Sequence, residues 1–389
     1  MKKITHSILL LFIVSITNSC VEEFNAATVE FEDAIVIEAT ITNEFKYQKI
    51  LLSRTHKLEK NNPSPESDAT IKITSGSNNT YTFHETEPGI YMSDIQFNAQ
   101  PSSNYQLSVT ASSGEEYTSQ PTELTSNTSV IENVYAIRET SEDGVDGITI
   151  YVDSFDLINS SRYYGFEFEE TYQIIAPRWV PNEYVYIPAT LTTPETAVLV
   201  PRTQEERVCF ATINSQGRLT TNTNLLSEDR ISKFPIKFIP LDDIRISSRY
   251  SILLKQHTQS AESYNFYETL NNLSSSESLL SQNQPGFLAG NIFSINNPNE
   301  KVLGFFEVSS VKQKRAFFNR SDYTNVFFWD AWYCKPFELD SNLNPFEAPF
   351  ISLIRNKRIS YFSQKKVVLR ACGDCTQLGS NIRPSFWID

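Results

Sequence analysis

Short runs of alternating apolar and polar residues dominate the chain and predict a mainly β protein. Between residues 34 and 121 these runs recur about every 8–12 residues, and turn residues bound each of them. Ala34–Thr42 and Tyr105–Ala111 alternate well, while Ser75–Asn79 and Ser112–Gly114 separate runs that predict hairpins. Because no helical pattern interrupts the runs, we expect an immunoglobulin-like β-sandwich over 34–121.

The polar stretch Thr122–Ser129 predicts a domain boundary, followed by a larger, mostly β domain over 130–389. Tyr163–Tyr172 is the clearest strand of this second domain. Its aromatic residues share one face and Glu167 and Glu169 share the other. Two carboxylates on one face could serve a glycosidase, but such pairs are more often solvated, so we assign no catalytic residue.

One helix is predicted in the second domain, near 261–273. Aromatic and leucine residues recur there at helical spacing, and Ser260 is a suitable N-cap. We expect this apolar stripe to pack on a sheet. Residues 177–225 mix prolines with polar runs and predict long loops that contain strands. The second domain is thus expected to be a larger β-sandwich-like domain with one packed helix.

An aromatic segment over 323–350 has no regular period and contains three prolines. Trp329, Trp332 and Tyr333 lie in its middle, among Asp, Asn and Pro residues. Exposed tryptophan and tyrosine rings commonly anchor interfaces, so these three residues are candidate interface aromatics. The alternative is that the rings of this segment fill the core of the second domain.

The N-terminus is built like a bacterial lipoprotein signal peptide over residues 1–19. Two lysines precede the apolar run Ile8–Ile16, which is much shorter than the roughly 20 residues of a spanning helix. Cys20 follows and is the expected lipidation site, because acyl chains on its thiol and its new N-terminus would anchor the protein firmly. Residues 20–33 then form a lipidated tether. The alternative is an ordinary secretory signal with a chance cysteine.

Charge and length limit the classes of partner. The 389-residue chain has a formal net charge of −13, which becomes −15 once the two signal lysines are removed. An acidic chain without a Lys/Arg-rich run is a poor candidate for binding nucleic acid or anionic headgroups. The sequence has no second segment of membrane-spanning length, so we expect membrane attachment through the lipid alone.

Four cysteines remain if Cys20 is lipidated: Cys209, Cys334, Cys372 and Cys375. An even number in an oxidising compartment predicts one or two disulfides, and the sequence does not choose among the three full pairings. Cys372 and Cys375 form a C-x-x-C motif, which could also be redox-active or half of a zinc site. Asp374 and the lack of a following helical pattern disfavour redox chemistry, so we expect structural disulfides and no metal or cofactor.

Several segments together resemble the domain of unknown function 4249 family of surface lipoproteins. These segments are Cys20–Phe24, Thr80–Phe83, Glu85–Tyr91, Cys209–Phe210, Ser263–Tyr267, Pro285, Gly290–Ile292, Val302–Phe306, Cys372–Cys375 and Pro384–Trp387. Glu22 and Glu23 also resemble the surface-export signal of Bacteroidota lipoproteins. The resemblance implies an outward-facing outer-membrane protein, of a kind often encoded beside TonB-dependent transporters. It implies no catalytic residue.

We therefore expect a non-catalytic binding or accessory lipoprotein, lipid-anchored in the outer membrane and facing the cell exterior. Its partner would be a TonB-dependent transporter, or another barrel, in nutrient uptake. One alternative is a structural subunit of an outer-membrane assembly or secretion complex. A second is an uncharacterised hydrolase, although the sequence contains no G-x-S-x-G, H-E-x-x-H or phosphate-loop motif. The ligand cannot be identified from these patterns.

Overall fold

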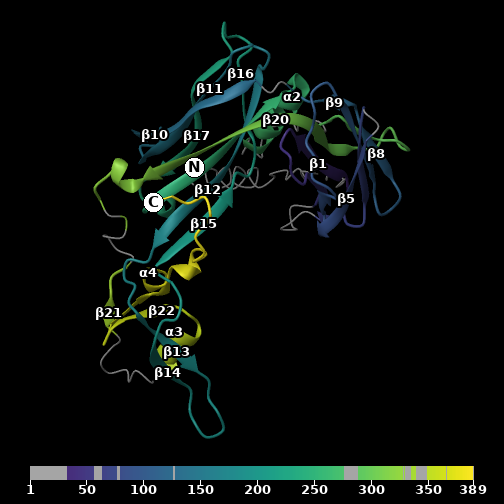
Figure 1. Cartoon of the computed structure of the whole chain (residues 1–389). Helices are drawn as coiled ribbons and strands as arrows, with labels where there is room; N and C mark the ends of the chain where they lie inside the picture. Colours follow the sequence, from purple (N-terminus) through teal and green to yellow (C-terminus); the bar gives the residue numbers. More distant parts are fainter. Residues whose placement is uncertain are drawn as a thin grey trace, which may run out of the picture.

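The computed structural model shows a mainly β protein, as the sequence predicts (Figure 1). It describes residues 33–56, 64–76, 79–125, 128–275, 288–326, 328, 334–338, 348–364 and 366–388. Cys20, Glu22 and Glu23 lie outside these residues, as do the candidate aromatics Trp329, Trp332 and Tyr333. Within the described part of the chain, no helix is long and apolar enough to cross a membrane.

The N-terminal strands curl around the first hydrophobic core. They are β1 (Ile35–Thr42), β2 (Lys49–Arg54), β3 (Ser64–Pro65), β4 (Thr70–Ser75), β5 (Thr80–Glu87), β6 (Ile90–Ser93), β7 (Asn104–Thr110), β8 (Glu116–Ser119) and β9 (Thr122–Glu123). In β4, exposed and buried residues alternate strictly, as the alternating sequence pattern predicts. The spatial order β1-β2-β6-β5-β4-β7-β8 joins neighbouring strands through antiparallel ladders.

Two strands from much later in the chain complete this lobe. β19 (Ile292–Ser294) pairs with β8, and β20 (Val302–Asn319) pairs in parallel with β1. The side chain of Asn291 then bonds the backbone of Phe306, accepting from N at 2.7 Å and donating to O at 2.8 Å. The first core therefore contains residues from beyond 290 as well as residues from 34–121.

Gly304 allows β20 to lie against β1. Its φ is +119°, and a Cβ placed there would lie 1.9 Å from the carbonyl oxygen of Ile37. A side chain is excluded both by the backbone conformation and by the neighbouring strand, so glycine is required at this junction.

The second lobe has two layers. The larger sheet continues from β20 into β18 (Arg249–Gln259), β12 (Tyr163–Ile175), β15 (Val208–Asn214) and β16 (Leu219–Asn222). The opposing layer contains β10 (Ser129–Thr140), β11 (Asp146–Asp156) and β17 (Arg230–Pro240). Buried side chains from both layers form the second core, so the lobe is sandwich-like. The first half of β20 belongs to the N-terminal lobe and its second half pairs with β18, which makes β20 the shared strand.

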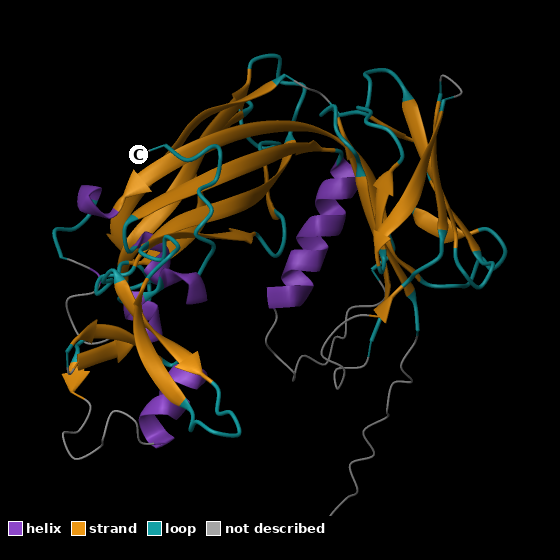
Figure 2. Ribbon diagram, turned by 60° about the horizontal axis from the view of Figure 1, so that its bottom comes forward, coloured by secondary structure: helices purple, strands orange, loops and turns teal. Residues whose placement is uncertain are grey.

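The predicted helix forms as α2 (Ala261–Ser275) and lies between the two β lobes (Figure 2). Ser260 caps it, because its Oγ accepts from Ser263 N at 3.1 Å. Phe266 packs on Phe305 of β20, with ring centroids 5.3 Å apart. The helix therefore packs on the large sheet, as expected from its apolar stripe.

A small third lobe combines two distant stretches of sequence. Its elements are β13 (Asn182–Ile187), β14 (Thr196–Pro201), β21 (Phe337–Glu338), α3 (Ala348–Arg355), β22 (Ile359–Ser363) and β23 (Lys366–Leu369). Two short helices, α4 (Arg370–Gly373) and η4 (Cys375–Gln377), follow. The third lobe has its own core, around Phe350 and Ile354 of α3. The sequence pattern gave no sign of α3 or of a lobe built partly from 177–225.

Candidate functional site

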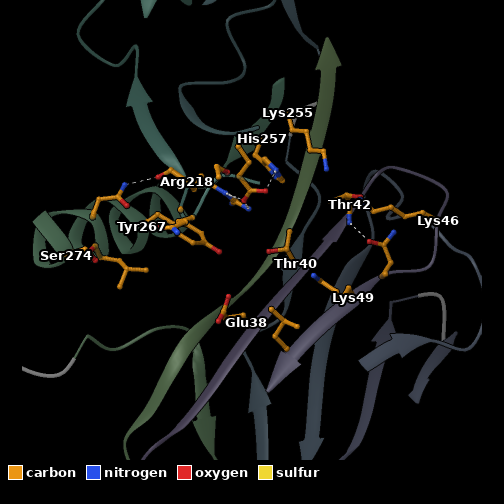
Figure 3. Close-up of a pocket in the computed structure, with 18 of the residues that line it drawn as sticks. Glu38, Thr40, Thr42, Lys46, Lys49, Arg218, Lys255, His257, Tyr267 and Ser274 are labelled. Carbon is orange, nitrogen blue, oxygen red and sulfur yellow. Dashed lines mark hydrogen bonds and ion pairs between the residues drawn. The ribbon is translucent and has the colours of Figure 1, made fainter. Parts of the chain in front are cut away.

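A cleft opens between the N-terminal lobe and the second lobe (Figure 3). We call it the interlobe cleft, and its volume is about 650 Å³. β1 and the chain after it form one wall, while β18, the β15–β16 turn and α2 form the other. The lining residues are Glu38, Thr40, Thr42, Lys46, Tyr47, Gln48, Lys49, Leu51, Glu167, Ser215, Gln216, Gly217, Arg218, Lys255, His257, Tyr267, Leu270, Asn271 and Ser274.

Arg218 joins two carboxylates from different strands inside this cleft. It ends the turn between β15 and β16, and its side chain is 4% exposed. Its Nε donates to Glu167 Oε1 at 2.9 Å, and its Nη1 binds Glu307 Oε2. The Tyr267 ring of α2 lies against the guanidinium, with Cζ 4.5 Å from the ring centroid. One cation thereby connects β12, β20 and α2.

Glu307 is a carboxylate buried within β20, and its side chain is 2% exposed. Its Oε1 accepts from Ser263 Oγ at 2.6 Å and from Gln259 Nε2 at 3.3 Å. Its Oε2 accepts from Thr40 Oγ1 at 3.5 Å as well as from Arg218. Because a buried charge is costly unless it is paired and hydrogen-bonded, these four donors explain how the carboxylate is tolerated.

The network keeps its charges at neutral pH. Burial acts to raise the pKa of Glu307, but attraction to Arg218 and His257 holds it below its ordinary value. Burial opposes ionisation of Glu167 too, yet contacts with His257 and Arg218 hold its pKa well below the usual range. Burial raises the pKa of Tyr267 to about 12, so its phenol stays protonated.

His257 connects Glu167 to Ser309. Its Nε2 lies 3.5 Å from Glu167 Oε2, and its Nδ1 lies 3.4 Å from Ser309 Oγ. Serine, histidine and carboxylate occur in this order in nucleophilic hydrolases, where the separations are about 2.6–3.2 Å. Here both separations are longer, Ser309 is fully buried, and its Oγ donates to Thr258 O at 3.0 Å. This geometry is that of a packed polar network, so we assign no nucleophile.

The rim of the interlobe cleft carries both charge signs and an exposed aromatic ring. Lys46, Lys49 and Lys255 supply positive charge, and Lys46 lies 2.5 Å from the carboxylate of Glu44. Tyr47 is 49% exposed beside them. The rim can therefore hydrogen-bond a polar ligand and cover an apolar part of it with Tyr47.

All four predicted cysteines are in disulfides. Cys209 of β15 pairs with Cys375 of η4, with Cα atoms 5.6 Å apart, and Cys334 pairs with Cys372 of α4 at 5.4 Å. The expected structural disulfides are confirmed, and neither the redox nor the zinc alternative fits cysteines that are bonded in this way. The two cysteines of the C-x-x-C motif bond to different partners.

The structure separates the two carboxylates that share a face of β12. Glu167 joins Arg218 in the interlobe cleft, whereas Glu169 pairs with Arg315 at 2.9 Å. Sequence reasoning missed Arg218, His257 and Glu307 as members of one site. The available signal was Glu307 itself, because a single carboxylate inside the apolar run of β20 requires a buried partner.

A family model described as "Domain of unknown function (DUF4249)" matches residues 21–315 of this chain. This span includes every residue of the Arg218 network. It ends before the C-terminal segment with Cys372 and Cys375, which the sequence resemblance had included. No curated protein matches the chain.

Solved structures give only distant likenesses. A DUF4785 family protein from Legionella pneumophila is 7% identical, with a TM-score of 0.20, over 56% of this chain and 50% of that one. The native conformation of E. coli alpha-2-macroglobulin is 8% identical, with a TM-score of 0.17, over 60% and 14%. The chain thus spans half the length of the first structure and 14% of the length of the second. Neither likeness supports a functional argument.

Proposed function

Since the chain belongs to the domain of unknown function 4249 family, we propose that it is a non-catalytic binding lipoprotein of the outer membrane. In this proposal Cys20 carries the lipid, and Glu22 and Glu23 direct the protein to the cell exterior. There it accompanies a TonB-dependent transporter and presents a small polar ligand to it during nutrient uptake. The N-terminal sequence supports the location, and the interlobe cleft supports the binding role.

The observation that carries the binding role is the construction of the interlobe cleft. Its volume of about 650 Å³ lies in the usual range for small-ligand sites. Both lobes share β20, and the Arg218–Glu307 pair connects the walls, so the cleft exists before a ligand arrives. A preformed site binds at a lower entropic cost than one that must be assembled.

Two substitutions on α2 test the cleft. Ser274→Trp should fill it, because Ser274 is exposed and lines the cleft. Thr269→Trp is the matched control, since Thr269 is exposed on the same helix but does not line the cleft. Each hydroxyl donates to the carbonyl four residues earlier, so both changes remove the same kind of bond.

The readout is native mass spectrometry after incubation with a polysaccharide hydrolysate or a casein hydrolysate. The wild-type protein and Thr269→Trp should each retain a bound small molecule, and Ser274→Trp should retain none. Binding that survives in Ser274→Trp, or no binding to the wild type from either hydrolysate, would contradict the proposed site.

The partner is tested by affinity purification of the full-length protein from detergent-solubilised membranes. A TonB-dependent transporter should copurify, and Cys20→Ser should lose it because the protein no longer reaches the membrane. Copurification of an outer-membrane assembly or secretion machine instead would reject the uptake role. Protease added to intact cells should cut the wild type, whereas replacing Glu22 and Glu23 with alanine should protect the protein from cutting.

A further inference from the structure

A second cleft, of about 630 Å³, lies at the opposite end of β18 from His257. Ser247 and Ser248, which follow η1 (Ile244–Ile246), and the start of β18 bound it on one side. The end of β20, the short helix η2 (Arg320–Asp322) and the residues after it bound the other side. Arg249 and Arg320 both line it. We call it the arginine cleft.

Arg249 has no carboxylate partner within the described residues. Its Nη1 donates to the amide oxygen of Asn319 at 2.5 Å, and its guanidinium lies 5.0 Å from the Phe317 ring centroid. Its buried Nε has no hydrogen-bond partner in that part of the chain. Asp322 accepts from the Asn319 backbone and side chain, and the described residues show no ion pair between it and Arg249. The Nε–H group of Arg249 therefore has no acceptor among the described residues.

Arg320 is held by neutral groups. Its Nε donates to Val326 O at 2.8 Å, and its Nη1 donates to Leu241 O at 2.7 Å and to Ile246 O at 3.3 Å. Nη2 takes part in none of these bonds. Burial lowers the pKa of Arg320, and no carboxylate among the described residues counteracts this. Three carbonyls thus fix the guanidinium in place without neutralising its charge.

Further donors surround the two arginines. The buried Oγ of Ser247 has no hydrogen-bond partner among the described residues. Ser248 Oγ donates to Gln173 Oε1 at 2.9 Å, which turns the carbonyl end of this amide toward Ser248. The nearby Arg245 differs, because Asp243 and Glu170 already neutralise it. Among the described residues, positive charge without a carboxylate partner and spare donors thus gather at this cleft.

We propose that the arginine cleft binds a ligand through a phosphate or sulfate group. A guanidinium presents parallel N–H groups that match the oxygens of such an anion, and a charged acceptor strengthens each bond. A phosphate or sulfate group carries close to two negative charges at neutral pH, so it balances Arg249 and Arg320 together, whereas a carboxylate balances only one of them.

The test is a ³¹P NMR titration of the whole protein, purified in a neutral detergent, with inorganic phosphate at constant ionic strength. The phosphate signal should broaden saturably, and sulfate should displace phosphate much better than acetate does. Arg249→Gln should raise the Kd for phosphate at least ten-fold. Arg230→Gln is the matched control, because Arg230 also lies over a phenylalanine ring, at 4.9 Å, but pairs with Glu132. It should leave the Kd unchanged.

Ser247→Ala is a second variant that removes only a hydroxyl, and it should raise the Kd about three-fold. Glycerol 1-phosphate and glucose 6-phosphate distinguish a lipid headgroup from a soluble phosphate ester. Binding of either one, weakened by Arg249→Gln, supports the proposal. The proposal is overturned if phosphate binding is not saturable, if acetate competes as well as sulfate, or if folded Arg249→Gln keeps the wild-type Kd.

Discussion

At the scale of single residues, Glu307 shows what a buried charge does in this protein. Its carboxylate accepts from β1, α2, β18 and the β15–β16 turn through Thr40, Ser263, Gln259 and Arg218. A buried ion pair adds little net stability over an apolar pair, because desolvation offsets the attraction. We infer that its main effect is specificity, because a packing that separated Arg218 from Glu307 would leave both charges buried and unpaired.

Arg218→Met should therefore destabilise the protein strongly. The change leaves Glu307 without its cation, and breaking one side of a buried pair costs about 3–5 kcal/mol. Urea unfolding measures the loss. Lys46→Gln is the control, because its ion pair is solvent-exposed and should contribute at most about 1 kcal/mol. A loss for Arg218→Met no larger than that for Lys46→Gln would show that the buried pair is not formed.

The same residues predict how stability depends on pH. The folded pKa of Glu307 lies below the unfolded value of about 4.3, so the unfolded state takes up the proton first on acidification. This contribution is complete above roughly pH 5 and is lost as the pH falls through the folded pKa. Urea unfolding at pH 7 and pH 4 should show a smaller pH dependence in Glu307→Gln than in the wild type. An equal dependence in the two proteins would contradict this linkage.

The sequence predicts the residues of this network unequally. Glu167 could be placed on the polar face of its strand because alternation is a local property. Arg218 lies in a turn and His257 lies in a strand, and neither has a local pattern that points to the other. Their meeting depends on pairing between β12, β18 and β20, which the sequence periodicity does not specify.

At the scale of elements, the Cys209–Cys375 disulfide holds the C-terminal segment against β15 of the second lobe, and the Cys334–Cys372 disulfide ties α4 to the chain before β21. Beyond Cys375, Trp387 is buried against Phe210 of β15 and Phe317 of β20, with ring centroids 4.9 Å and 5.6 Å away. Local patterns predicted that the final cysteines form structural disulfides. They could not predict the pairing, which depends on where β15 and Cys334 lie in space.

Peptide mapping without reduction tests the pairing. Cleavage before Asp374 separates Cys372 from Cys375, after which trypsin releases the peptides that contain Cys209 and Cys334. The Cys375 half should remain bonded to the Cys209 peptide, and the Cys372 half to the Cys334 peptide. A bond between the two halves would contradict the structure. Replacing Cys209 and Cys375 together with serine should cost about 2–5 kcal/mol in urea unfolding.

At the scale of the whole molecule, the lobes are joined by pairing rather than by a linker. β20 belongs to the N-terminal sheet over Val302–Ser309 and to the second lobe beyond it. The sequence predicted the short N-terminal strands and the polar boundary over 122–129. It could not predict β20 as a partner of β1, because strand periodicity identifies a strand without identifying its neighbour.

We expect a fragment of residues 34–125 not to fold alone. It lacks Ile292, Val302, Phe306 and Val308, which are buried in its core. Burying four such side chains contributes about 6–12 kcal/mol, and a whole domain is stable by only about 5–15 kcal/mol. The fragment should show no cooperative urea transition and little amide protection. Appending residues 288–311 through a flexible linker should restore both, because β19 and the first half of β20 would return. Cooperative unfolding of the short fragment alone would instead establish 34–121 as an independent domain.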